Sequence, residues 1–163
     1  MRRAAALAAV LLGLTAPVQA QDDDPSDSDH LVVVEQTPWV VPGGAFALRL
    51  RIDDPPDGAQ LRMALYDAVG TRSAFVRSLD GEGLRRRLTD NVAVPLDDVT
   101  VADDGSVDLR IVTGPVTGEP VDVQLDADDE GVYPVVVELL DEDDEVVDRL
   151  ITHLVRLPDP NPD

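Results

Sequence analysis

The acidic turn DADDEG, Asp126–Gly131, is the stretch of this sequence closest to a metal-binding loop. It places acidic residues at positions 1, 3 and 5 and glycine at position 6, as an EF-hand calcium loop does. Position 12 is Val137 instead of the bidentate glutamate that such a loop requires. We therefore expect a solvated acidic turn and no metal site. If calcium bound there, Asp126, Asp128 and Glu130 would be the side-chain ligands.

Other residue combinations that carry chemistry are missing from the sequence. The two histidines, His30 and His153, are far apart in the sequence and there is no cysteine, so a zinc site is not expected. No serine lies in a G-x-S-x-G motif, and carboxylates are too numerous for any pair to be diagnostic. His153 lies in the apolar stretch ITHLV, where a packed or hydrogen-bonded histidine is expected. We predict that the protein is not an enzyme and has no catalytic residue and no cofactor.

Charge limits the partners of this chain. Its formal net charge is −20, with 33 acidic residues and 13 basic residues that are all arginine. Such a charge argues against nucleic acid or an anionic membrane as a partner. The cluster Arg85–Arg87 could dock an acidic polymer or headgroup, but we expect it to neutralise neighbouring acidic residues.

The single tryptophan, Trp39, lies between Pro38 and Pro42 in the stretch TPWVVPGGAF. Prolines cannot donate hydrogen bonds to a strand ladder, and the pair Gly43-Gly44 permits a tight turn. The first strand is therefore expected to stop, bend and cross between sheets. We expect Trp39 to cap the open end of the core, with its indole N–H hydrogen-bonded. The alternative is an exposed Trp39 that binds a glycan or a partner protein.

The start of the chain predicts a cleavable signal peptide. Arg2 and Arg3 precede a short apolar stretch, Ala4–Leu14, and small residues lead to a cleavage site between Ala20 and Gln21. The apolar stretch is shorter than the ~20 residues of a membrane-spanning helix, which is the competing interpretation. We expect an exported protein, extracellular or associated with the cell envelope, whose mature domain is not inserted in the membrane.

Alternating apolar and polar residues, separated by turns rich in Asp, Gly and Pro, dominate the rest of the sequence. About seven or eight short strands predict an all-β fold, an immunoglobulin-like antiparallel β-sandwich, without the cysteines of antibody domains. Thr71–Leu88 is less regular and predicts a short helix or an irregular crossover. The organisation expected is a signal peptide (1–20), a disordered acidic leader (21–29), one domain (30–157) and an acidic, proline-rich tail or linker (158–163).

Particular strands can be recognised within that domain. Phe46–Ile52 and Gln60–Asp67 each place apolar residues on one face and arginine on the other. The last stretch, Val146–Leu157, is apolar on both faces, which favours a central strand. Pro134 interrupts the stretch before it and favours an edge strand or a bulge. The other candidates are Leu31–Thr37, Val107–Val112, Val121–Leu125 and Val132–Leu140.

Several stretches together carry a resemblance to a family: EQTPWVVPGGAFALRLRI (Glu35–Ile52), TRSAF (Thr71–Phe75), LDGEG (Leu79–Gly83) and GVYPVVVELLDEDDEVVDRLITHLVRL (Gly131–Leu157). They resemble the amino-terminal region of large actinobacterial envelope proteins of unknown function. That family is secreted and membrane-anchored, and its genes often lie beside the gene for the lipid II flippase. The resemblance implies an exported β-rich module ahead of further domains and supplies no catalytic residue.

The partner that these expectations favour is an envelope protein or a wall polymer. A passive spacer domain, an accessory domain of a larger glycan-acting protein and a calcium-dependent adhesion module are the alternatives. The chain ends at Asp163, whereas the family continues for several hundred residues. A fragment, a truncated reading frame or a stand-alone relative would each account for this difference. The sequence sets no oligomeric state.

Overall fold

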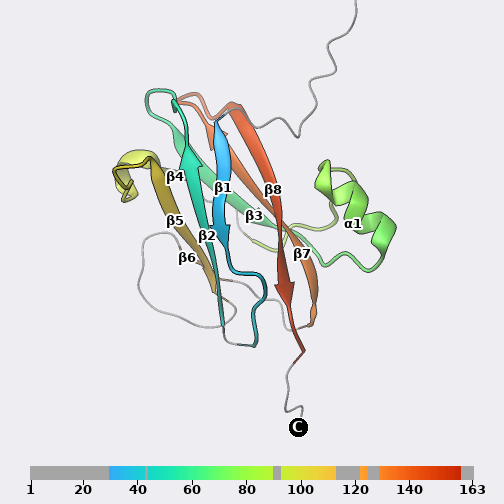
Figure 1. Ribbon diagram of the computed structural model, residues 1–163. Coiled ribbons are helices and arrows are strands. Elements are labelled where there is room, and N and C mark those ends of the chain that lie inside the picture. Colours follow the sequence, from blue (N-terminus) through green and yellow to red (C-terminus); the bar gives the residue numbers. More distant parts are fainter. Residues whose placement is uncertain (1–29, 43, 90–92, 113–121, 125–128, 159–163) are drawn as a thin grey trace, which may run out of the picture.

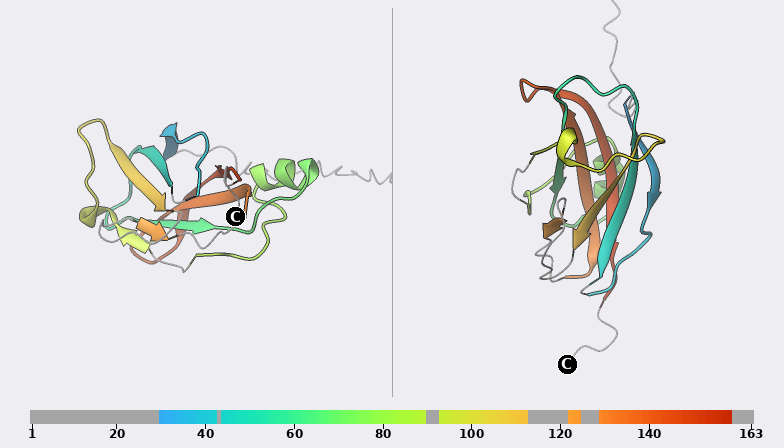
Figure 2. Two further views of the ribbon diagram at one scale, coloured as in Figure 1. Left: turned by 90° about the horizontal axis from the view of Figure 1, so that it is seen from below. Right: turned by 90° about the vertical axis from the view of Figure 1, so that its left-hand side faces the viewer.

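The computed structural model describes residues 30–42, 44–89, 93–112, 122–124 and 129–158, and its strands form two four-stranded sheets (Figure 1). The two views in Figure 2 show the sheets packed face to face as a sandwich. The strands are β1 (Leu31–Gln36), β2 (Ala45–Ile52), β3 (Gln60–Leu65), β4 (Ala93–Pro95), β5 (Ser106–Val112), β6 (Asp122–Gln124), β7 (Gly131–Leu140) and β8 (Val146–Arg156). A helix, α1 (Arg72–Leu79), and a 3-10 turn, η1 (Leu96–Asp98), lie between strands.

The order of the strands is that of an immunoglobulin-like sandwich. One sheet has the order β1-β2-β5-β6 and the other β4-β3-β7-β8. The triplet β1-β2-β5 and the quartet β4-β3-β7-β8 correspond to strands A-B-E and C′-C-F-G of such domains. All pairs are antiparallel except β5 and β6, which are parallel. The predicted fold class is thus confirmed.

The core lies between the sheets and follows the predicted alternation. In β2, Phe46, Leu48 and Leu50 are each no more than 1% exposed, while the residues between them point outward. In β3, Leu61 and Leu65 are buried in the same way. The inward residues of these two strands, with others from β1, β5, β7 and β8, form one apolar cluster. Area removed from water on both sheet faces is the main stabilising term of such a sandwich.

Two expectations about the final strands are wrong. The interior strand is β7, which pairs with both β3 and β8, whereas β8 lies at the edge of its sheet. Pro134 nevertheless fits in β7 without a bulge at its position. Its carbonyl accepts a hydrogen bond from Tyr66 N (3.0 Å), just beyond Leu65, where β3 ends. The nitrogen of Pro134 faces β3, as its carbonyl does. The N–H that proline lacks therefore removes a hydrogen bond only at the end of the β3–β7 ladder and not within it.

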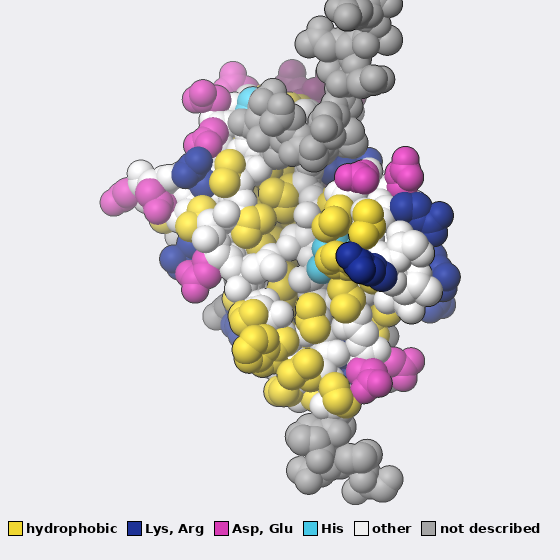
Figure 3. Space-filling model, turned by 45° about the vertical axis from the view of Figure 1, so that its right-hand side comes forward, with side chains coloured by type: hydrophobic (Ala, Val, Ile, Leu, Met, Phe, Trp, Pro, Cys, Tyr) yellow, Lys and Arg dark blue, Asp and Glu magenta, His cyan; other side chains and the backbone are white. Residues whose placement is uncertain are grey.

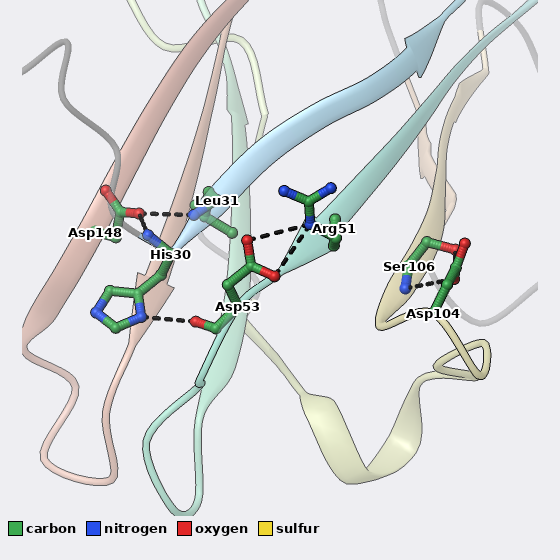
Figure 4. Close-up of polar contacts among 7 residues, drawn as sticks. All are labelled: His30, Leu31, Arg51, Asp53, Asp104, Ser106 and Asp148. Atoms are coloured by element: carbon green, nitrogen blue, oxygen red, sulfur yellow. Dashed lines mark hydrogen bonds and ion pairs between the residues drawn. The ribbon is translucent and has the colours of Figure 1, made fainter.

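The first strand is joined to the last, although they belong to different sheets. Asp148 Oδ2 in β8 accepts hydrogen bonds from the backbone N–H groups of His30 and Leu31, both at 2.8 Å (Figure 4). Further along, the hydroxyl of Thr152 donates to the side-chain oxygen of Gln36. We call these contacts, together with the pairing of Val40 described below, the β1–β8 seam.

A tyrosine at the start of β7 fixes the turn that enters this strand. Tyr133 is only 4% exposed, and its hydroxyl donates a 2.7 Å hydrogen bond to the carbonyl of Asp129, four residues upstream. Val135, two residues later, is fully buried. A tyrosine so placed on strand F is the tyrosine corner of immunoglobulin-like domains, with Val135 at the position where antibody domains carry a cysteine.

Replacing this hydroxyl should measurably destabilise the protein. We expect Tyr133→Phe to lower the free energy of unfolding by about 1 kcal/mol, because the Asp129 carbonyl loses its partner while the ring stays buried. Urea denaturation followed by circular dichroism measures this. Tyr66→Phe is the matched control, since Tyr66 is partly exposed and its hydroxyl makes no hydrogen bond within the described residues. Equal effects of the two substitutions would contradict the role given to Tyr133.

Candidate interaction surface

The segment after β1 crosses from one sheet to the other, as the prolines and glycines predicted. Thr37 still belongs to the first sheet, where its backbone N–H donates to the carbonyl of Ala47 (2.9 Å). Val40 has already joined the second sheet: its N–H donates to Val155 O, and its carbonyl accepts from Leu157 N, both at 2.8 Å. The crossing therefore happens within three residues, and Val40 pairs with Arg156 in a parallel bridge.

Trp39 lies at this crossing and points away from the core, so the expectation that it caps the core is wrong. Its side chain is 57% exposed, and its indole N–H has no hydrogen-bond partner in the part of the chain that the structure describes. The physical reason is alternation. Val40 turns inward and is 3% exposed, which forces its neighbours Trp39 and Val41 to the outer face.

The parallel register brings more apolar side chains beside Trp39. With Val40 opposite Arg156, Trp39 lies next to Val155, and Val41 lies next to Leu157. Val41 is 48% exposed, Leu157 is 37% exposed and Val155 is partly exposed. We call these four residues the Trp39 surface. Figure 3 shows apolar side chains gathered at the end of the molecule from which the C-terminal segment leaves.

A further backbone hydrogen bond involves Val41. Gly44 N donates to Val41 O (2.8 Å), which closes a turn directly before β2. A Cβ on Gly44 would lie 2.9 Å from that same oxygen, so this position requires glycine. The aromatic rings of Phe46 and Tyr133 are buried, which leaves aliphatic side chains as the companions of Trp39.

Helix α1 covers another part of the outer face of β8. Thr71 Oγ1 caps the helix by accepting from Ala74 N (3.1 Å), which confirms the expected short helix in this region. The Phe75 ring lies 4.7 Å from the His153 ring, centroid to centroid. Ser78, which is fully buried, donates to the Phe75 carbonyl (2.7 Å), and its hydroxyl oxygen lies 2.9 Å from His153 Nε2, within hydrogen-bond distance.

This serine–histidine pair docks the helix on β8. The Ser78 side chain is fully buried beneath α1, so its hydroxyl is not open to a substrate in this structure. Burial lowers the pKa of His153 below its ordinary value of 6.5, so the ring is neutral at pH 7. His153 is thus packed and hydrogen-bonded, as the sequence predicted.

A charged group on the same outer face joins three neighbouring strands. Glu138 in β7 lies opposite Arg62 of β3 and Arg149 of β8, and its carboxylate binds both guanidinium groups at 2.5 Å. Burial raises the pKa of Glu138, but the hydrogen bonds from Arg149 and Arg62 outweigh that effect and leave the pKa below its usual value. The contacts of Glu138 with Arg62 and Arg149 join β3, β7 and β8, so this is a structural contact.

The arginine cluster behaves only in part as expected. Arg86 approaches Asp67 at 3.3 Å, with 77% of its side chain exposed. Arg85 is exposed and has no ion pair within the described residues. Arg87 is partly buried and bridges Tyr66 through the backbone. Of the three arginines, Arg86 is the one that pairs with a neighbouring acidic residue, as expected, within the described part of the chain.

The remaining candidates give no site in the described residues. His30 Nδ1 donates to the carbonyl of Asp53 (2.8 Å; Figure 4), a structural contact. Residues Asp126 and Asp128 of the acidic turn lie outside the described residues, as do the cleavage site, the leader and the end of the tail. The described ranges hold no group of three or more metal-ligating side chains. They also hold no helix with the length and apolar character needed to span a membrane.

Fluorescence of the single tryptophan tests the geometry of this surface. We expect native emission at nearly the wavelength of the urea-unfolded chain, and efficient quenching by acrylamide, because the indole is already in water. A blue-shifted native emission that acrylamide quenches poorly would show that the Trp39 side chain is buried, and would contradict this geometry. Substituting Trp39→Ala should leave the free energy of unfolding within about 0.5 kcal/mol of the original, as is usual for exposed positions.

The buried histidine should make stability depend on pH. Since its folded pKa is lowered, the unfolded chain binds the proton more readily, and the stabilisation present above pH 6.5 is lost as pH falls below that value. We expect the free energy of unfolding to fall more steeply between about pH 7.5 and 5.5 in the original protein than in His153→Asn. Parallel pH profiles of the two proteins would contradict this.

Comparison with known proteins assigns the chain to no family. The sequence matches no protein-family model, and a search of curated proteins gave no significant match. The resemblance to envelope proteins therefore remains an expectation.

Proposed function

We propose that this chain is a non-enzymatic, exported interaction module that docks a partner protein of the cell envelope through the Trp39 surface. The observation that carries the proposal is the outward position of the only tryptophan, at 57% exposure, within an apolar group. Tryptophan is the residue type most enriched among those that dominate binding energy. A grouped set of exposed apolar side chains favours an interaction surface over a passive spacer.

The surrounding structure supports binding by this surface. Backbone hydrogen bonds on either side of Val40 fix the segment that carries Trp39 against β8. The neighbours of Trp39 are valines and a leucine, which lose little rotamer freedom when they are covered. A partner would therefore bury apolar area without first having to order a loop, and preorganisation of this kind favours affinity.

The envelope setting rests on the sequence. A predicted signal peptide leads the domain, and the resemblance is to proteins of the actinobacterial envelope whose genes often lie beside the lipid II flippase gene. We infer that the partner belongs to that envelope, with a connection to peptidoglycan assembly. The two wall-related alternatives, a wall polymer as ligand and a glycan-acting partner domain, use the same exported location.

Site-specific photocrosslinking in an exporting host tests the proposal. A photoreactive amino acid at position 39 should give a discrete crosslinked protein product, because the side chain at this position faces the partner. The same residue at position 34 is the matched control, since Val34 is 52% exposed on a bulge of β1, away from the Trp39 surface. Val41→Asp in the position-39 protein should abolish the product by placing a charge inside the interface.

Each outcome decides between the candidates. A product from position 39 that is lost in Val41→Asp, with none from position 34, supports a protein partner. Equal products from both positions would indicate random collision. A folded, exported protein with no product at either position would favour the spacer.

A further inference from the structure

The basic residues of this acidic protein are unevenly distributed. Five of its 13 basic residues fall between residues 72 and 87, a stretch with only two acidic residues, Asp80 and Glu82. Folding places Arg72 and Arg77 on α1, which packs on β8. The following segment, with Arg85–Arg87, meets the end of β3 at Tyr66 and Asp67. Figure 3 shows arginine side chains grouped on that side of the molecule, next to apolar ones. A local positive surface is therefore maintained on a chain with a net charge of −20.

Four of these arginines are exposed, and we call them the arginine face: Arg72, Arg77, Arg85 and Arg86. The first three make no ion pair with any residue that the structure describes, and Arg86 has only its exposed 3.3 Å contact with Asp67. A chain with 33 acidic residues could easily have supplied partners. Unpaired, solvent-facing guanidinium groups in such a chain are available for an external anion.

The arginine face has shape as well as charge. A shallow depression runs along the first turns of α1 and is lined by Thr71, Arg72, Ser73, Val76 and Arg77. Guanidinium and hydroxyl groups are the donors that phosphate oxygens accept most readily. Next to the face, Arg87 Nε is buried and lacks a hydrogen-bond partner within the described residues, so this region holds one more unsatisfied donor.

The helix that carries the face is firmly seated. Beyond the Ser78–His153 contact, the chain turns at Gly81 with φ of 74°. A Cβ at that glycine would lie 3.1 Å from Ile151 Cδ1, so the helix end approaches β8 closely. The arginines of α1 therefore project from a fixed support, and binding would cost mainly the ordering of their side chains.

We propose that the arginine face binds a linear chain of phosphate groups of the inorganic polyphosphate type. This is a second binding surface, which uses none of the residues of the Trp39 surface. A flat anionic bilayer would bring the acidic remainder of the protein within a screening length of about 8 Å of like charge. A thin chain can instead follow the basic stretch and avoid the acidic regions. An acidic protein segment offers only carboxylates, which this chain already has in excess and which pair with the face at Asp67 alone.

Binding of fluorescently labelled inorganic polyphosphate to the whole purified protein, followed by anisotropy, tests the proposal. The triple variant Arg72→Gln, Arg77→Gln, Arg85→Gln should bind at least about tenfold more weakly, and its affinity should fall less steeply as salt rises from about 50 to 200 mM. The matched control is Arg49→Gln, Arg51→Gln, Arg110→Gln, which removes the same charge from the other sheet. We expect this control to lower affinity by less than about threefold.

The remaining outcomes overturn the proposal. Equal weakening of binding in both triple variants would indicate a general effect of net charge. Absence of binding by the original protein would rule out the arginine face as a binding surface for this polymer. Tighter binding to phosphatidylglycerol vesicles or to polyglutamate, with the same dependence on arginine, would replace the polymer with a membrane or an acidic protein. If the triple variant loses its native circular dichroism, Arg85→Glu alone, outside the helix, carries the test and should still weaken binding. Crosslinking at position 39 can succeed or fail independently.

Discussion

The β1–β8 seam is the constraint on which the candidate surfaces depend. These strands are the edges of two different sheets, and an open edge would leave backbone groups free to pair with other chains. Asp148 ties the start of β1 to β8, and Val40 ties the chain to the end of β8. To reach β8 the chain must leave β2 directly after Thr37. That crossing turns Val40 into the core and Trp39 into solvent.

Patterns within a strand could be predicted from the sequence, and relations between strands could not. Alternation in β2 identified its buried face because each residue there has one environment, core or water. In β8 the same logic failed, because the strand is apolar on both faces and yet lies at the edge of its sheet. Its outer face is apolar because α1 packs on His153 and the following turn, at Gly81, packs on Ile151. The local sequence pattern shows that both faces of a strand are apolar, but it does not show whether a helix or other strands bury the outer face.

The candidate surfaces show the same division. The bend at Pro38 could be predicted, but the direction of Trp39 depends on which sheet the crossing chain joins. Arg85–Arg87 were visible as a cluster in the sequence, whereas Arg72 and Arg77 belong to the same surface only because α1 carries them there. Tyr133 is different, since a tyrosine two residues before a buried position on the penultimate strand is a local signal of the tyrosine corner.

The two surfaces share one strand, which fixes the geometry between them. On the outer face of β8, Ile151 and His153 lie under α1 and its following turn, while Val155 borders the Trp39 surface. Alternate residues of a strand are about 7 Å apart, and no loop intervenes. A partner that reached both surfaces would gain the second contact at high effective concentration, without paying to order a linker. Cooperation between the two surfaces would then arise from the partner's reach.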